Sequence, residues 1–138
     1  MSPSGIEGRA LIDGSASGIA VVLDEPLSFW GGFDPVAGRI IDGRHPQAGQ
    51  VLTGRIVVMP GGRGSSSSSS VLAEAVRART APAGILLGST DPIIALGALV
   101  ARELYGIVLP VVVLGDSYST LKAGATVTMS GARVTLHP

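Results

Sequence analysis

The chain of 138 residues contains no cysteine. Disulfide bonds are therefore excluded, and so is an iron–sulfur cluster or a thiolate zinc site held by this chain alone. A metal centre of that kind would need ligands from another polypeptide. Aromatic residues are scarce as well, at 4%, so the core has to be built from Val, Leu, Ile and Ala.

Net charge is also lacking, because ten acidic residues balance ten basic ones that are scattered along the chain. Without a basic patch, we expect no nucleic acid and no anionic membrane surface among the partners. The first eight residues lack the basic start and apolar centre of a signal peptide, and the apolar runs are too short to span a bilayer. These features predict a cytoplasmic protein.

Hydrophobic residues make up 46% of the chain, and its length fits a single domain over 1–138. Two β-branched runs around an Asp-Gly-Ser turn predict a hairpin or meander of 6–11 with 19–23. Further strands are predicted at 36–42, 52–59, 83–87, 109–114, 125–129 and 133–136. Helices are predicted at 71–79, at 92–105 between an Asp91 N-cap and Gly106, and in short form at 117–123. This order predicts an α/β domain of layered β/β/α type.

A glycine turn with six following serines, Ser65 to Ser70, connects a predicted strand to a predicted helix. Glycine permits positive φ and a close approach of a ligand to the backbone. Serine is a favoured N-cap, and the first amides of a helix carry partial positive charge, so the element predicts a cradle for an anion. A flexible serine linker is the alternative. A phosphate-binding P-loop fits poorly, because the only lysine is the distant Lys122.

Two other features have open interpretations. Phe29, Trp30 and Phe33 fall within five residues beside two glycines. Their rings could plug one end of the core, or the loop could wrap around a ligand or a partner surface. His45 could serve as a base or phosphoryl acceptor, although a single histidine beside a proline in a polar turn is typically a solvated residue.

The sequence resembles the swivel domain of the aconitase superfamily, because Gly62, Arg63, Gly64, Ser65 and Ser66 form its glycine-x-glycine-serine-serine turn between a strand and a helix. More narrowly, it resembles the small subunit of the aconitase X family. The closer likeness is carried by residues 27–35, Gly38, Ile40 and the segments 60–65, 81–85, 94–98 and 109–112. These features cover nearly the whole chain in the expected order.

The resemblance implies a swivelling β/β/α domain that is the small subunit of a two-subunit hydro-lyase. The large subunit would hold an iron–sulfur cluster, while this chain would bind neither cofactor nor metal. Known members dehydrate cis-3-hydroxy-L-proline in bacteria or mevalonate 5-phosphate in archaea, and segments 29–32 and 63–65 look more like the bacterial type. The implied reaction converts cis-3-hydroxy-L-proline, a small hydroxy acid, to pyrroline-2-carboxylate. Mevalonate 5-phosphate dehydration is the alternative, and a non-catalytic swivelling module for anion binding or phosphotransfer is the alternative of another class.

Residue roles follow from the same resemblance. The first serine after glycine-x-glycine is the catalytic base of aconitase-like swivel domains, and that position is Ser65. A neutral hydroxyl is a weak base, so its oxyanion would need helix amides and a nearby cation. Arg63, Gly64 and Ser66 are the expected substrate-binding residues. Aconitases proper place a carboxylate-clamping arginine where this chain has Ser67, and a smaller monocarboxylate substrate is compatible with that loss.

Overall fold

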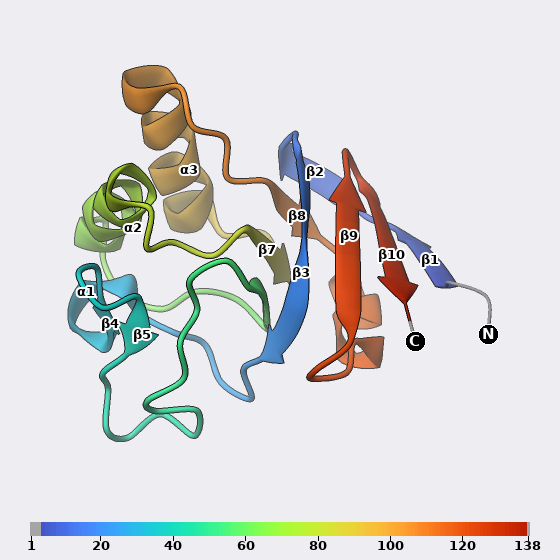
Figure 1. Cartoon of the computed structure of the whole chain (residues 1–138), viewed down its shortest axis with the longest axis horizontal. Helices are drawn as coiled ribbons and strands as arrows, with labels where there is room; N and C mark the ends of the chain where they lie inside the picture. Colours follow the sequence, from blue (N-terminus) through green and yellow to red (C-terminus); the bar gives the residue numbers. More distant parts are fainter. Residues whose placement is uncertain (1–3, 138) are drawn as a thin grey trace.

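The computed structural model describes residues 4–137 (Figure 1). Its strands are β1 (Ser4–Glu7), β2 (Arg9–Ile12), β3 (Ser15–Val22), β4 (Phe33–Asp34), β5 (Arg39–Ile40), β6 (Ile56–Met59), β7 (Gly84–Leu87), β8 (Val111–Val113), β9 (Thr126–Ser130) and β10 (Arg133–His137). Its helices are α2 (Ser67–Ala78), α3 (Pro92–Tyr105), a one-turn element α1 (Phe29–Gly32) and the 3₁₀ helix η1 (Gly115–Thr120). Helices α2 and α3 lie on one side of the central strands, and β9 and β10 lie on the other (Figure 1).

The main sheet has the strand order β1-β10-β9-β3-β6-β7-β8-β2. Strands β3, β6, β7 and β8 are parallel neighbours, whereas the remaining pairs are antiparallel. The first half of β3 pairs with β9 and its last three residues pair with β6, so this strand joins the two layers. The outermost strands of the order, β1 and β2, are separated only by Gly8. The two ends of the strand order are therefore adjacent in the chain.

Strands β6 and β7, at the centre of the parallel part of the sheet, are buried on both faces. Val57 and Met59 of β6 belong to the core beneath α2 and α3, whereas Ile56 and Val58 belong to the core that includes β9 and β10. Alternate side chains of each strand thus enter different apolar layers, which explains why these strands read as unbroken apolar runs. The predicted β/β/α layering is confirmed.

The predicted pairing of 6–11 with 19–23 is wrong. The first run divides at Gly8, where a Cβ would lie 2.6 Å from Val112 Cγ1 and from the Val113 carbonyl oxygen. Its two halves pair with β10 and β8, at the other end of the sequence. The turn between the runs predicted a local hairpin, but the partners are set by long-range packing.

The predicted strand 36–42 is too long, because within it only Arg39–Ile40 form a strand, β5, which pairs with the equally short β4 before it. The chain turns between them at Gly38, which has a φ of +71°. A Cβ at Gly38 would lie 3.0 Å from the Thr80 carbonyl oxygen, so the turn also needs a residue without a side chain. Val36 is left 86% exposed at this turn.

Helix α3 confirms its predicted bounds and caps. The Asp91 carboxylate accepts the N–H groups of Ile93 and Ile94, and Gly106 ends the helix with a φ of +68°. Helix α2 begins at Ser67 rather than residue 71, so the last four serines are helical and the linker interpretation is excluded. The short helix predicted at 117–123 is the 3₁₀ helix η1 over Gly115–Thr120.

Candidate active site

The candidate site lies at the edge of the sheet where the parallel strands end. Residues 60–66 leave β6 there, between the loops that follow β3 and β7. Gly62 forms a parallel bridge with Leu27 of the first loop, and Ser89 of the other donates its N–H to the Pro60 carbonyl at 3.1 Å. The carboxyl edge of parallel strands is a common place for ligand sites, because loops from several strands converge on it.

Two glycines of the turn are required by close packing. The Gly62 N–H donates to Asp91 Oδ2 at 2.7 Å, and a Cβ on Gly62 would lie only 2.2 Å from that oxygen. Gly64 has a φ of +108°, and a Cβ there would lie 2.5 Å from Ser28 Oγ and 3.0 Å from Ser68 Oγ. The two glycines therefore allow the backbone of the turn to pack closely against its neighbours, and they also leave room for a ligand to approach.

The expected catalytic residue, Ser65, is exposed immediately before α2. Its Oγ accepts the Ser67 N–H at 3.4 Å, and its carbonyl oxygen accepts the Ser68 N–H at 3.0 Å. Ser66, the residue at the N-cap position, is exposed as well and has helical dihedral angles without a side-chain cap bond. Ser65 thus lies at the positive end of the helix dipole, which stabilises a negatively charged oxygen.

Ser68 has a structural role that its sequence position did not reveal. Its side chain is buried, and its Oγ accepts the Trp30 N–H at 3.2 Å and lies 3.4 Å from Ser28 Oγ. The Ser28 hydroxyl donates in turn to the Trp30 carbonyl oxygen at 2.9 Å. These bonds hold residues 29–33, the aromatic segment, against the first turn of α2.

The aromatic segment divides its rings between the two expected roles. Phe29 and Phe33 are buried in the core with their centroids 5.3 Å apart, in an edge-to-face arrangement. Trp30 is 62% exposed, although its backbone is held against α2. The phenylalanines confirm the core interpretation, and the indole remains available to a ligand or a partner.

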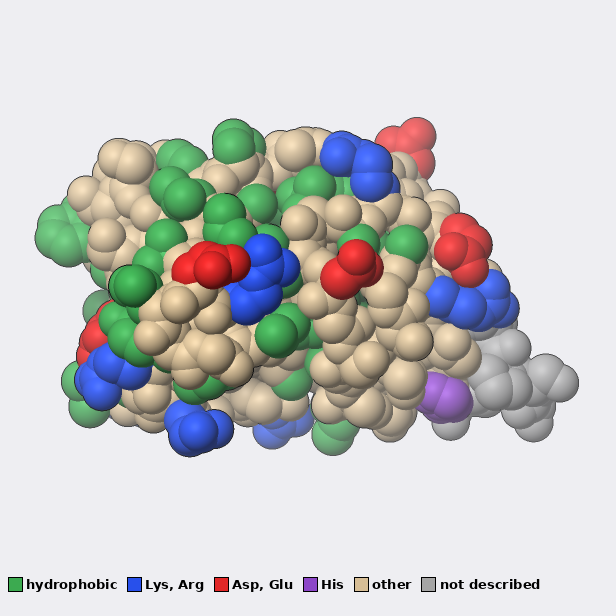
Figure 2. Space-filling model, turned by 90° about the horizontal axis from the view of Figure 1, so that it is seen from above, with side chains coloured by type: hydrophobic (Ala, Val, Ile, Leu, Met, Phe, Trp, Pro, Cys, Tyr) green, Lys and Arg blue, Asp and Glu red, His purple; other side chains and the backbone are tan. Residues whose placement is uncertain are grey.

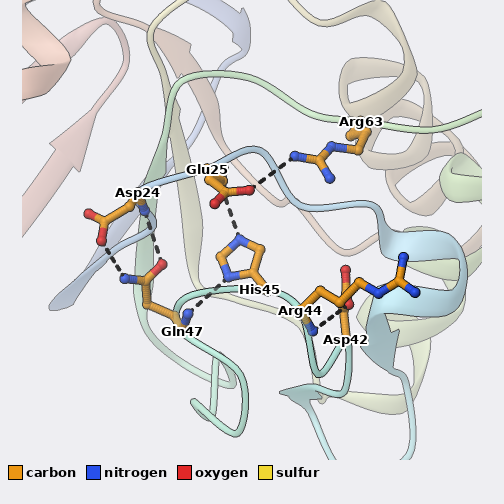
Figure 3. Close-up of polar contacts among 7 residues, drawn as sticks. All are labelled: Asp24, Glu25, Asp42, Arg44, His45, Gln47 and Arg63. Atoms are coloured by element: carbon orange, nitrogen blue, oxygen red, sulfur yellow. Dashed lines mark hydrogen bonds and ion pairs between the residues drawn. The ribbon is translucent and has the colours of Figure 1, made fainter.

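Arg63 extends from the turn toward the loop after β3, and its Nη2 lies 3.5 Å from Glu25 Oε1 (Figure 3). Both side chains are about half exposed. The structure thus brings Arg63, Gly64, Ser65 and Ser66 into one turn, but directs the guanidinium toward Glu25. Glu25 was not recognised from the sequence, since it is separated from Arg63 by 38 positions.

His45 is buried, which contradicts the expectation of a solvated residue. Its Nδ1 accepts the Gln47 N–H at 3.0 Å, so its Nε2 carries the proton that is donated to the Glu25 carbonyl oxygen at 3.1 Å (Figure 3). The Asp42 side chain accepts the Arg44 N–H and does not orient the imidazole. With both ring nitrogens engaged, His45 is a structural residue and a poor phosphoryl acceptor.

Charged side chains of both signs lie singly and in pairs over the face shown in Figure 2. The ion pairs of the described residues are all on the surface. In one of them, a hydrogen bond from Arg77 lowers the pKa of Glu74. No helix among the described residues is long and apolar enough to cross a bilayer.

The residues that the structure describes do not fit an iron–sulfur cluster or another metal centre. The sequence has no cysteine, and residues 4–137 contain no group of three His, Asp or Glu side chains that could hold a metal ion. Two hollows of about 260 and 380 Å³ lie away from the serine turn. The first is lined by Pro82 and Leu109, among others, and the second by Gln50 and Arg55.

The layered fold and the exposed glycine–serine turn together define a β/β/α swivel domain. The family model of the aconitase X swivel domain matches residues 5–137. The chain belongs to the aconitase X swivel domain family. A crystal structure of Thermococcus kodakaraensis aconitase X in its holo form superimposes with a TM-score of 0.88 and 32% identity, over 98% of this chain and 99% of that one.

Curated relatives fall into two groups. A cis-3-hydroxy-L-proline dehydratase of Pseudomonas aeruginosa is 46% identical over 129 residues, which are 94% of this chain but 22% of that protein. A phosphomevalonate dehydratase small subunit of Methanothermobacter thermautotrophicus is 42% identical over 96 residues, which are 70% of this chain and 73% of that protein. The chain thus spans about a fifth of the length of the first relative and most of the second.

Proposed function

We propose that this chain is the swivel part of a dehydratase that converts cis-3-hydroxy-L-proline to pyrroline-2-carboxylate. The observation that carries the proposal is the exposed Ser65 at the amino end of α2, in a chain 46% identical to a cis-3-hydroxy-L-proline dehydratase. Aconitase X-type hydro-lyase chemistry follows from the family, and activity requires a partner. That partner is a large subunit, or the corresponding part of a longer polypeptide.

Ser65 is the proposed base. Its oxyanion would take the proton from the carbon that bears the substrate carboxylate, and hydroxide would leave from the neighbouring carbon as the double bond forms. The enamine product then tautomerises to the pyrroline. The Ser67 N–H, which already bonds Ser65 Oγ, and the dipole of α2 support the oxyanion. Arg63, Gly64 and Ser66 are the proposed substrate-binding residues.

The partner has two further tasks in this proposal. The turn is open to water, whereas proton abstraction from carbon is favoured in a closed site. The partner would cover the turn, and the iron–sulfur cluster would belong to it, because this chain has no ligands for one. Departure of hydroxide is accordingly left to groups outside this chain.

A second substrate has a specific observation in its favour. The phosphomevalonate dehydratase small subunit is 42% identical and closer to this chain in length than the hydroxyproline enzyme. Mevalonate 5-phosphate dehydration is therefore the alternative. An anion-binding or phosphotransfer module through His45 is less well supported, since both imidazole nitrogens are occupied by backbone groups.

Turnover by the assembled enzyme tests the proposal. The chain is produced with its large subunit, and each of the two substrates is offered to the same preparation. We expect pyrroline-2-carboxylate from hydroxyproline, and a loss of about a thousandfold in kcat for Ser65→Ala, the size of a missing general base. Ser70→Ala, the same change at an exposed serine of α2, is the control and should keep full activity. Unchanged turnover in Ser65→Ala would remove the assigned role, and turnover of mevalonate 5-phosphate alone would favour the alternative.

A further inference from the structure

Two opposite charges lie side by side next to the serine turn. Arg63 directly precedes Gly64 and Ser65, and its guanidinium lies 3.5 Å from the Glu25 carboxylate (Figure 3). The side chains are 54% and 51% exposed, respectively. The positive member of the pair thus belongs to the same turn as Ser65.

The pair is loose, although the backbone on each side is held firmly. One Nη2 to Oε1 contact at 3.5 Å is at the outer limit of a hydrogen bond, and exposed pairs of this kind are weak. By contrast, the Glu25 carbonyl oxygen accepts His45 Nε2 at 3.1 Å, and the Arg63 N–H donates to the Leu27 carbonyl at 3.2 Å. The neighbouring Asp24 is fixed on its backbone and side chain by Gln47. The backbone that carries the two charges is thus anchored, while the bond between their side chains is easily exchanged.

Both members of the pair have unused bonding capacity. A guanidinium has five N–H donors, and a carboxylate has two acceptor oxygens. Among residues 4–137, the only side-chain bond of either group is the one between them. A ligand can therefore bind Arg63 through an anion and Glu25 through a cation without breaking any other contact.

We propose that Arg63 and Glu25 form a receptor for a zwitterion, in which Arg63 binds the carboxylate of an amino-acid substrate and Glu25 binds its ammonium group. This inference rests on the proposed function and names the feature that selects its substrate. The ammonium and carboxylate of an α-amino acid are attached to one carbon, so they can lie across the pair as an opposed dipole. Arg63 is the substrate-binding group for any carboxylate, whereas Glu25 sets the specificity.

The same geometry discriminates between the two substrates of the relatives. Cis-3-hydroxy-L-proline carries a ring ammonium beside its carboxylate. Mevalonate 5-phosphate has two anionic groups and no cation, so Glu25 would repel it where it assists the zwitterion. Glu25 thus contributes to specificity in two ways. It attracts the ammonium group of the zwitterion, and it repels a substrate that carries only negative charges.

Binding of two non-reacting ligands to the assembled enzyme tests the receptor without turnover. L-Proline is a zwitterion, and cyclopentanecarboxylate has the same ring size and carboxylate but a methylene in place of the ammonium. By titration calorimetry, the wild-type enzyme should prefer L-proline by about tenfold, the worth of one charge-assisted hydrogen bond. Glu25→Gln should abolish the preference by weakening L-proline only, and Arg63→Gln should weaken both ligands.

Glu7→Gln is the matched control, because Glu7 also forms an exposed ion pair with an arginine, Arg133, outside the serine turn. It should leave both affinities unchanged. The proposal is overturned if the wild-type enzyme does not discriminate between the ligands, or if Glu25→Gln keeps the preference. Turnover of hydroxyproline, measured on the same preparations, reports separately on the proposed reaction, so the two hypotheses can fail independently.

Discussion

At the scale of single residues, Gly64 shows how narrowly the serine turn is constrained. Its φ of +108° is rarely adopted by other residues, and the side chains of Ser28 and Ser68 occupy the space that a Cβ would need. The residue before the proposed base therefore has a steric role in addition to a possible contact with substrate.

Gly64→Ala should lower the free energy of unfolding by about 3 kcal/mol, because backbone strain and a side-chain clash add. Gly49→Ala is the matched control. Gly49 has a φ of +89°, but no atom lies within 4 Å of a Cβ built on it. Strain alone should cost this control about 1 kcal/mol. Chemical denaturation measures both variants, and equal losses would show that the contact with Ser28 and Ser68 has no effect.

The residues of the candidate site differ in how far the sequence could reveal them. Arg63, Gly64, Ser65 and Ser66 are consecutive, so one motif was enough to predict that they share a turn. Glu25 and Ser68 contribute through contacts between distant segments, and their residue types carry no signal of that contact. His45 was predicted wrongly because its neighbours in sequence are polar, whereas its surroundings in the fold are buried.

At the scale of elements, Asp91 links the start of α3 to the serine turn. One carboxylate oxygen caps the helix through Ile93 and Ile94, and the other accepts the Gly62 N–H at 2.7 Å. A single side chain thus fixes the position of the turn relative to a helix.

Substitutions at Asp91 should separate these two tasks. Asp91→Ala loses both, with an expected cost of about 2 kcal/mol in the free energy of unfolding. Asp91→Asn keeps one acceptor oxygen for the cap, but its amide group cannot accept the Gly62 N–H. The asparagine variant should therefore keep most of the stability while amide exchange at Gly62 becomes faster. Exchange at Gly62 that stays as slow as in the wild type would contradict the link.

The elements themselves were predicted best where the signals are local. The caps of α3 and the apolar runs of β7 and β8 are visible in a few adjacent residues, and these elements were found close to their true bounds. Strand partners were not predictable in this way, because β1 and β10 lie at opposite ends of the sequence. The serine run was predicted to begin a helix, but the apolar stripe placed its first residue at 71 instead of Ser67. Serine has a modest helix propensity, and the burial of Ser68 and Ser69 in the fold is not visible in the sequence.

At the scale of the whole molecule, the single tryptophan can report on binding of the proposed partner. Trp30 is 62% exposed and is attached through Ser68 to the turn that carries Ser65. A subunit that covers the turn should also bury part of the indole.

The isolated chain should show the red-shifted fluorescence of a solvated indole and strong quenching by acrylamide. Assembly with the large subunit should shift the emission to the blue and protect it from quenching. A large subunit with its own tryptophans replaced by phenylalanine isolates the signal, and Trp30→Phe in this chain provides the blank. An unchanged spectrum in a complex verified by size-exclusion chromatography would place the interface elsewhere.

The pairing of β1 with β10 sets where the domain can be joined to other chains. Ser4 lies opposite Leu136, so the two ends of the described residues lie at one corner, at the end of the long axis away from α2 and α3 (Figure 1). A peptide linker attached at that corner would leave the serine edge unobstructed. The same module can then act as a separate subunit or as one part of a fused polypeptide, which fits relatives of which this chain matches 73% and 22% of the length. Gene fusion in this family would need no change at the candidate site.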